Sequence, residues 1–319
     1  MIGYIIRRLL ALIPILFGVA IFVFIATRMM PGNIAQIMCG NNCTDEQIAE
    51  LEADYGLDKP IPEQFVEWIG GMARGDLGDS FLRNRPVADE IVDRLPITLE
   101  LLILTMIIST VVGVGMGAIS AMNHRRWPDA GIRVFNIMGM ALPAFWVATL
   151  VILLPSIWFS YAPPFQHISI FEDPWGNMRE YVPPALVMGL ASSCGLARIV
   201  RGSILGVVGQ DFIRTARAKG LSESLVIRRH ALGNAMLPVV TILGMQVAGL
   251  MGGTVIIEQV FALNGLGRLV FESATMRDYP VLQVMALYTV VVVVMMFLFI
   301  DLAYAWLDPR VRLTGGQHA

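Results

Sequence analysis

Residues 9–30 read LLALIPILFGVAIFVFIATRMM, an apolar run in which Arg28 is the only charged side chain. A bilayer core about 30 Å thick requires about 20 such residues in an α-helix. Five further runs meet that length. The six spans are expected at residues 9–30, 97–122, 134–159, 184–208, 236–257 and 281–307. The sequence therefore predicts an all-α integral membrane protein with six transmembrane helices.

The composition supports a membrane class and argues against nucleic acid as a partner. Hydrophobic residues make up 56% of the chain and charged residues 15%, whereas about 25% of a typical soluble protein is charged. The net charge of −2 provides no basic surface for a polyanion. The first apolar run is too long for a cleaved signal peptide, so we interpret it as an uncleaved anchor.

The distribution of charge predicts the orientation of the spans. Of 23 basic residues, 14 lie at the amino end, in the loops after the second and fourth spans, at the end of the fourth span, or in the tail. The same face carries five of the 25 acidic residues. Short loops rich in Lys and Arg stay in the cytoplasm, so both termini are expected there. The fourth span is expected to leave the bilayer near Arg198 and Arg201.

This topology divides the chain into 1–30 (tail and first span), 31–96 (an external segment) and 97–319 (the transmembrane core). Within the external segment, TDEQIAELEADYGL (44–57) and EQFVEWIGGMA (63–73) predict short helices. Such helices act as a lid or docking surface, or as a structural plug, and both interpretations stay open. Cys39 and Cys43 form either a disulfide or two free thiols. No metal site is expected there, because neither His nor a further Cys lies nearby.

Polar and small residues inside the spans have two interpretations. Four polar residues are candidate pore-lining side chains or, as we favour, interhelical hydrogen-bonding groups: Asn136, Thr149, Ser193 and Gln246. Two small-residue motifs predict tight helix crossings: Gly113-x-Gly115-x-Gly117 and Gly249-x-x-x-Gly253. Asp301, in the sixth span, indicates an ion pair or a snorkelling group more than a proton carrier.

The most informative segment is QDFIRTARAKGLSESLVIRRHALGNAMLP (210–238), which is too polar to span and too regular for a linker. Its apolar residues predict one face of a short helix pair: Ala216, Ala218, Leu221, Leu225 and Ile227. Gly220 allows a sharp turn between the two helices. Such a pair is suited to transmitting a push from a soluble partner. The alternative is a basic loop that sets topology.

This segment resembles the EAA loop of importer permeases in the ATP-binding-cassette (ABC) superfamily. Its RTARAKGLS is similar to the version in the dipeptide/oligopeptide (and nickel) permease family. In the superfamily form Glu-Ala-Ala-x-x-x-Gly, Arg214 and Thr215 replace Glu and Ala, while Ala216 and Gly220 match. Further motifs similar to this family follow in order: MMPGN (29–33), YGLDKP (55–60), GDLGDS (75–80), RLPITLEL (94–101), GLGRL (265–269), RDYPVLQ (277–283) and DPRVR (308–312).

The resemblance implies a type I ABC importer permease fold in a bacterial or archaeal inner (plasma) membrane. It implies a coupling loop at 209–235 and coupling to a separate ATPase through eight residues: Arg214, Thr215, Ala216, Arg217, Ala218, Lys219, Gly220 and Leu221. The implied partners are a homologous second permease, two ATPases that bind ATP and Mg, and an extracytoplasmic substrate-binding protein. The implied substrate is a di- or oligopeptide, with nickel or another small solute as the alternative.

Two other functions are disfavoured by the residues themselves. An ion-coupled secondary transporter would need intramembrane carboxylates, and few are present. An intramembrane enzyme would need a catalytic constellation, but His124, His167, His230 and His318 share no span with a serine or acid at helical spacing. No Gly-Lys-Ser/Thr sequence occurs, so the chain is expected to bind no cofactor and to leave ATP to its partners.

Overall fold

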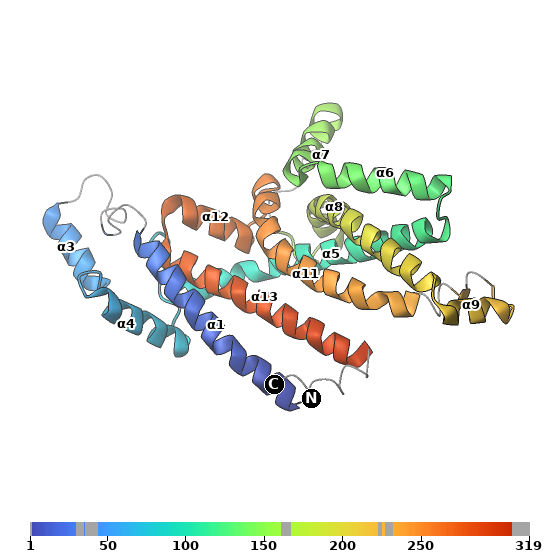
Figure 1. Cartoon of the computed structure of the whole chain (residues 1–319). Coiled ribbons are helices and arrows are strands. Elements are labelled where there is room, and N and C mark those ends of the chain that lie inside the picture. The colour runs from blue at the N-terminus through green and yellow to red at the C-terminus, as the bar shows by residue number, and fades with distance from the viewer. Residues whose placement is uncertain are drawn as a thin grey trace. The chain divides into compact units, whose positions relative to one another are not determined.

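The computed structural model describes residues 2–29, 35, 44–160, 167–222, 225–226 and 232–307, and the regular elements in these ranges are α-helices (Figure 1). They are α1 (Ile2–Met29), α3 (Asp45–Asp54), α4 (Ile61–Ala73), α5 (Val87–Met122), α6 (Trp127–Ala141), α7 (Ala144–Phe159), α8 (Pro174–Val208), α9 (Asp211–Ala218), α11 (Leu232–Val260), α12 (Leu266–Met276) and α13 (Tyr279–Leu307). The all-α prediction is confirmed for these ranges.

The helices give four to six candidate spans. Four are long and apolar enough by themselves: Leu10–Met29, Val87–Met122, Pro174–Val208 and Tyr279–Leu302. Two bent pairs, α6 with α7 and the two parts of α11, bring the number to six if each pair counts as one span. The α11 helix is the predicted fifth span, and it begins and ends within four residues of the expected bounds.

The predicted third span (134–159) is broken in the structure, because α6 and α7 meet at an angle of 93°. The break falls at Leu142, whose backbone is extended (φ −82°, ψ 128°) and which precedes Pro143. A proline ring disfavours the helical conformation of the residue before it. The chain therefore ends one helix at Ala141 and begins another at Ala144.

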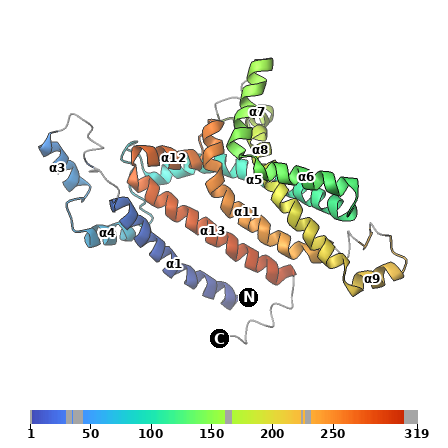
Figure 2. The same ribbon diagram turned by 45° about the horizontal axis from the view of Figure 1, so that its top comes forward.

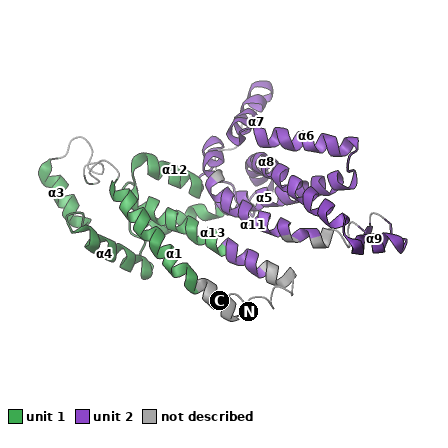
Figure 3. Cartoon of the chain, in the orientation of Figure 1, with its two compact units in different colours: residues 1–96, 265–295 green, residues 97–264, 296–319 purple. Residues whose placement is uncertain are grey.

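The chain forms two compact units (Figure 3). The first contains residues 1–96 and 265–295, and the second contains residues 97–264 and 296–319. The first unit thus combines the first helix and the external segment with α12 and the beginning of α13. The second unit contains the predicted coupling loop.

Within the second unit, α8 is the central helix, in contact with α6, α7, α9 and α11. Its approach to α5 depends on glycine, as predicted. A Cβ on Gly117 would lie 2.6 Å from Val200 Cβ and 2.7 Å from the Ala197 carbonyl oxygen. A Cβ on Gly113 would lie 2.9 Å from Leu196 Cδ2. Glycine at these positions lets the two helices pack backbone against side chain.

Two glycines of the predicted motifs make no close contact within the described part of the chain. A Cβ on Gly115, or on Gly249 of α11, would meet nothing within 4 Å. The close approach of α11 lies instead at Gly244, where a Cβ would collide with the Ile300 side chain of α13. A motif of small residues alone does not show which of its members faces a neighbouring helix.

Within the first unit, α4 packs on α1 through aromatic rings. Phe24 of α1 lies 5.3 Å from Phe65 and 5.5 Å from Trp68, measured between ring centroids. The Thr27 hydroxyl of α1 accepts a hydrogen bond from the Gln283 amide of α13 at 2.7 Å. This bond joins α1 to the first part of α13, and the two run side by side (Figure 1 and Figure 2).

Both helices predicted in the external segment are confirmed as α3 and α4. The α3 helix begins with a capping box, in which the Thr44 hydroxyl accepts from Gln47 N and the Gln47 side chain accepts from Thr44 N. This exchange satisfies two of the amide donors that the first turn of a helix leaves free.

The α5–α8 crossing makes a testable prediction. Replacing Gly117 with Ala should destabilise the fold by about 1–3 kcal/mol, the usual cost of overpacking, because backbone as well as side-chain atoms oppose the new methyl group. Gly115→Ala is the matched control on the same helix, and it should be neutral or stabilising by up to about 1 kcal/mol. Thermal unfolding in detergent measures both. Equal melting temperatures for the two variants would contradict the described crossing.

Candidate functional site

The predicted coupling loop begins with the short helix α9, which is fixed to the end of α8 by an apolar face. Ile213 is fully buried and Ala216 is 8% exposed. Both belong to one apolar cluster with Ile204 and Val207 of α8. Ala218, predicted on this face, is exposed, and Ile213 takes its place. The spacing of 213 and 216 is one helical turn, so the buried face follows from periodicity when it is counted from Ile213.

The turn after α9 depends on Gly220, as predicted. Its φ is +80°, a left-handed conformation that costs other residues about 1–2 kcal/mol. The Gly220 amide donates to the Arg217 carbonyl at 2.9 Å, and the Lys219 amide donates to the Thr215 carbonyl at 3.1 Å. Leu221 then turns back and packs against the same apolar cluster as Ile213. Residues 223–224 and 227–231 of the loop lie outside the described residues.

The opposite face of α9 is open and basic. Its exposed residues are Phe212, Arg214, Thr215, Arg217, Ala218 and Lys219. Arg214 lies 3.4 Å from Asp211, in a pair whose side chains are 74% and 95% exposed. The Thr215 hydroxyl donates to the Asp211 carbonyl at 3.0 Å, within its own helix.

The α8 helix, which carries α9, is held by an ion pair around Asp129 of α6. Arg201 of α8 donates from Nε to Asp129 Oδ1 at 2.8 Å and from Nη2 to Oδ2 at 2.9 Å. The Ser120 hydroxyl of α5 donates to Oδ1 at 2.6 Å, and the Arg125 amide donates to Oδ2 at 3.1 Å. Asp129 is 1% exposed, so its charge is balanced by this bidentate partner and by hydrogen bonds.

Sequence reasoning missed this Asp129–Arg201 pair. The sequence gives Arg201 only as a residue near which the fourth span leaves the bilayer, and that exit stays a prediction; α8 itself continues to Val208. The available signal was an acidic residue at the start of one helix together with an arginine inside the apolar run of another. Nothing in the spacing, which is 72 residues, relates the two.

The candidate pore residues lie on four different helices. Ser193 is fully buried and donates to the Leu190 carbonyl of its own helix at 2.7 Å. Thr149 is exposed and donates to the Phe145 carbonyl at 2.9 Å. Asn136 is 6% exposed, and its Oδ1 has no hydrogen-bond partner among the described residues.

Gln246 of α11 joins three helices. Its Oε1 accepts from the Ser109 hydroxyl of α5 at 3.2 Å, and its Nε2 donates to the Ser192 carbonyl of α8 at 3.0 Å. Cys194, close to Ser192 on α8, is a buried free thiol. Cys39 and Cys43 lie outside the described residues.

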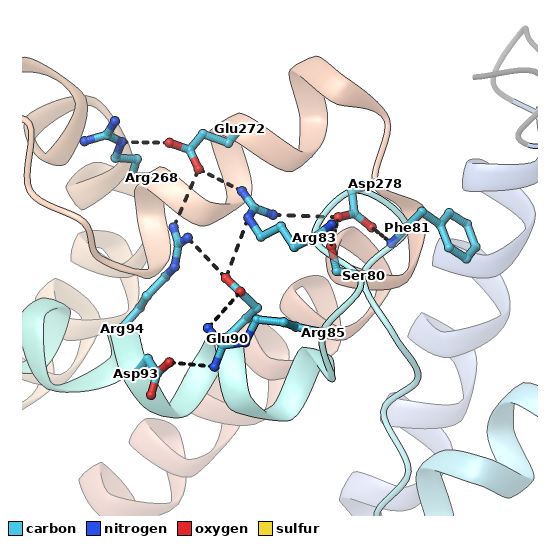
Figure 4. A network of polar contacts seen from close by, with 10 residues as sticks. All are labelled: Ser80, Phe81, Arg83, Arg85, Glu90, Asp93, Arg94, Arg268, Glu272 and Asp278. Carbon is cyan, nitrogen blue, oxygen red and sulfur yellow. Dashed lines mark hydrogen bonds and ion pairs between the residues drawn. The ribbon is translucent and has the colours of Figure 1, made fainter. Parts of the chain in front are cut away.

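The first unit holds a dense polar network, shown in Figure 4, in which arginines from residues 80–94 meet carboxylates of α12 and the turn after it. Arg83 lies 2.8 Å from Glu272, and Arg94 lies 3.1 Å from Glu90. Asp278 is fully buried and accepts from the Ser80 hydroxyl at 2.5 Å. These contacts tie residues 80–94 to α12 and to the turn after it.

Burial opposes ionisation of Glu272, but the hydrogen bond from Arg268 and the charges of Arg94 and Arg83 outweigh it. The pKa of Glu272 therefore lies below its ordinary value.

Comparison with known proteins gives the family. Residues 113–313 match the model of the binding-protein-dependent transport system inner membrane component, and residues 1–102 match the model of its N-terminal part. The chain belongs to this family. It is a permease subunit of an ABC importer, a multi-pass protein of the bacterial inner membrane and a translocation subunit, not an enzyme.

Curated relatives cover the chain almost completely. The permease is 39% identical over 312 residues to the glutathione transport system permease protein GsiC of Escherichia coli O6:H1, covering 98% of this chain and 99% of the relative. It is 38% identical over the same coverage to GsiC of Escherichia coli strain K12.

Solved structures support the type I importer permease fold. An inward-facing structure of the MetNI methionine ABC transporter matches with a TM-score of 0.55 and 14% identity, over 69% of this chain and 96% of that chain. An amino acid ABC transporter with histidines matches with a TM-score of 0.52 and 17% identity, over 67% and 92%. At these identities the likeness concerns the fold alone.

The Asp129–Arg201 pair predicts a large stability effect. Asp129→Asn should cost about 3–5 kcal/mol, because Arg201 is left without its counter-charge. Asp211→Asn is the matched control, since it removes a carboxylate from an exposed pair, and it should cost less than about 1 kcal/mol. Melting temperatures of the purified variants measure both. Similar small shifts for the two would show that the pair does not hold α8.

The network in the first unit predicts a pH dependence. Because the folded-state pKa of Glu272 lies below the ordinary value of about 4.3, its stabilising effect is complete above that value and is lost as the pH falls through the lowered pKa. Melting temperatures between pH 6 and pH 3 should fall less steeply for Glu272→Gln than for the unchanged chain. Parallel curves would remove Glu272 from the network's energetics.

Proposed function

We propose that this permease forms half of a translocation path for di- or oligopeptides and that α9 couples it to a separate ATPase. The observation that carries the proposal is the two-sided character of α9, which is fixed to α8 by Ile213 and Ala216 and open on its basic face. The proposed coupling residues are Arg214, Thr215, Ala216, Arg217, Ala218, Lys219, Gly220 and Leu221, within a loop at 209–235.

In the proposed coupling, α8 receives the movement of α9. A displacement of α9 moves the apolar cluster that Ile213 shares with Val207 and Ile204, and these residues belong to α8. The α8 helix contacts α6, α7 and α11, and Arg201 ties it to α6. A push at α9 therefore reaches three neighbouring helices through close-packed contacts, which transmit strain because protein interiors compress little.

The proposed assembly contains four kinds of partner. Two ATPases bind ATP and Mg, and each holds one coupling helix in a groove. A homologous second permease supplies the other half of the path. A soluble binding protein delivers substrate from the outer side, where residues 31–96 lie if both termini are cytoplasmic.

The proposed substrate is a short peptide. The relatives named above are glutathione transport permeases, and glutathione is itself a small peptide-like molecule. The relatives therefore favour a peptide over nickel. The candidate path residues on this chain are Asn136, Thr149, Ser193 and Gln246.

The test is a coupling assay on the complete complex in proteoliposomes. Gly220→Val forces a β-branched residue to adopt φ +80°, at a cost of about 1–2 kcal/mol, and so lowers the equilibrium constant for forming the turn by a factor of about 5–30. Substrate-stimulated ATPase activity and transport should fall, by at most that factor. Gly75→Val is the matched control, since Gly75 also has a positive φ (+87°) and open space around it, but lies in the first unit.

Assembly with the ATPases, checked by co-purification, should persist in both variants. Normal substrate-stimulated activity in Gly220→Val, or an equal loss in Gly75→Val, would contradict the role of α9.

A further inference from the structure

The turn between α5 and α6 carries positive charge that the proposed coupling does not use. Residues 123–133, which contain this turn and the start of α6, include three arginines, Arg125, Arg126 and Arg133, and a single acid, Asp129. Arg201 of α8 approaches the same acid. This junction of α5, α6 and α8 therefore contains four arginines and one carboxylate, an excess of three positive charges.

The single carboxylate is already satisfied. Both oxygens of Asp129 accept from Arg201, at 2.8 and 2.9 Å. Arg133 lies farther away, with its Nε 3.7 Å from Asp129 Oδ1, and its side chain is 55% exposed. Arg125 and Arg126 are exposed, and their guanidinium groups have no ion-pair partner among the described residues. The excess charge is therefore carried by three side chains at the surface.

The length of the preceding apolar run places this turn at the surface of the membrane. Residues 101–122 of α5 contain no charged side chain. These 22 helical residues are about 33 Å long, close to the thickness of the hydrocarbon core, about 30 Å. After Arg133 the next charged residue is Glu172. The three arginines therefore lie where the headgroups of one leaflet begin.

Trp127, the first residue of α6, supports this position. Its side chain is 91% exposed, which leaves a large apolar ring without cover from the described chain. At the boundary between acyl chains and headgroups, such a ring is sheltered from water while its N–H group stays hydrated. A tryptophan beside exposed arginines is therefore suited to contact with a lipid surface.

The partner proposed for α9 would lie farther from the membrane than this turn. Arg201 lies beside the turn, and seven residues, about 10 Å of helix, separate it from the end of α8 at Val208. The α9 helix follows beyond that end, on the same side of the second unit as the turn (Figure 1). The arginines of the turn thus lie at the level of the membrane surface, not at the level of the docking helix.

We propose that the α5–α6 turn binds anionic phospholipid headgroups of the adjacent leaflet through Arg125, Arg126 and Arg133. A guanidinium matches the geometry of a phosphate group and can donate two hydrogen bonds to it. A zwitterionic headgroup such as that of phosphatidylcholine carries a cation that the arginines repel, whereas phosphatidylglycerol has a net negative charge. Bound anionic headgroups also reduce the repulsion among the four arginines of the junction.

The test uses the complete complex in detergent, incubated with equal amounts of phosphatidylglycerol and phosphatidylcholine of the same acyl chains. Native mass spectrometry counts the bound lipids, and the unchanged complex should retain more phosphatidylglycerol. A basic side chain near the membrane surface contributes a factor of about five. Arg125→Gln and Arg126→Gln should therefore each lower the ratio of the two lipids by about fivefold, and together by at most about 25-fold.

Arg74→Gln is the matched control, because Arg74 is also exposed but lies outside the turn, and it should leave the ratio nearly unchanged. At about 1 M salt the Debye length falls to about 3 Å, so the preference of the unchanged complex should disappear.

Equal retention of the two lipids by the unchanged complex at low salt would overturn the proposal, whatever the folding of the variants. An equal fall in the ratio for Arg126→Gln and Arg74→Gln would also overturn it, since net charge alone would then explain the preference. Displacement of phosphatidylglycerol by inorganic phosphate would show a site for free anions and not for the membrane. The result is independent of the coupling assay, because it is read without ATP.

Discussion

Arg201 and Asp129 share two charge-assisted hydrogen bonds across the α6–α8 contact, and the position of α8 within the second unit depends on them. A carboxylate that is 1% exposed is costly to bury unless its charge is balanced. The planar guanidinium provides two donors with the geometry of the carboxylate, and Ser120 supplies a third contact from α5. Three helices therefore share one satisfied charge pair, close to the end of the helix from which α9 follows.

Close packing extends this constraint along α8. Gly117 and Gly113 bring α5 within van der Waals contact of Val200, which directly precedes Arg201, and of Leu196, which lies between one and two turns before it. The apolar cluster then continues through Ile204 to Ile213 of α9. Along α8 the glycine crossing at Leu196 and Val200 comes first, the ion pair of Arg201 follows directly, and the apolar cluster runs through both to Val207. The basic face of α9 lies outside this packed region and is exposed.

Much of the fold follows from the sequence, because the length of an apolar run and the spacing of caps are local properties. The spans, α3 with its Thr44 capping box, α4 and the turn at Gly220 were predictable for this reason. The break at Leu142 could also have been predicted from Pro143, but the apolar run continues across both residues and a single span was predicted. Two features depend on tertiary contacts, which no local pattern contains. They are the Asp129–Arg201 pair and the close approach of α11 to α13, which lies at Gly244 and not at Gly249. In the predicted coupling loop, Ala218 was misassigned to the buried face, since the period was counted from Ala216 and not from Ile213.

The two compact units contain different features of the chain. The first carries the arginine and carboxylate network around Glu272, and the second carries α8 and α9. Residues 31–96 are thus part of a unit that includes α12 and the start of α13, although some 170 residues of chain lie between them. The family relationship gives the chain's role as an importer permease, and α9 is the element through which we propose that it is coupled to an ATPase.

The most direct test of this account is cross-linking at Thr215 in the assembled transporter. Thr215→Cys, in a chain whose three cysteines are replaced by serine, would be treated with a short bifunctional maleimide with and without ATP. The account predicts a cross-linked product of permease and ATPase, absent for Thr275→Cys, an exposed position of the first unit. A Thr215→Cys thiol that reacts with a monofunctional maleimide equally fast in the assembled and the isolated permease, without any such product, would contradict it.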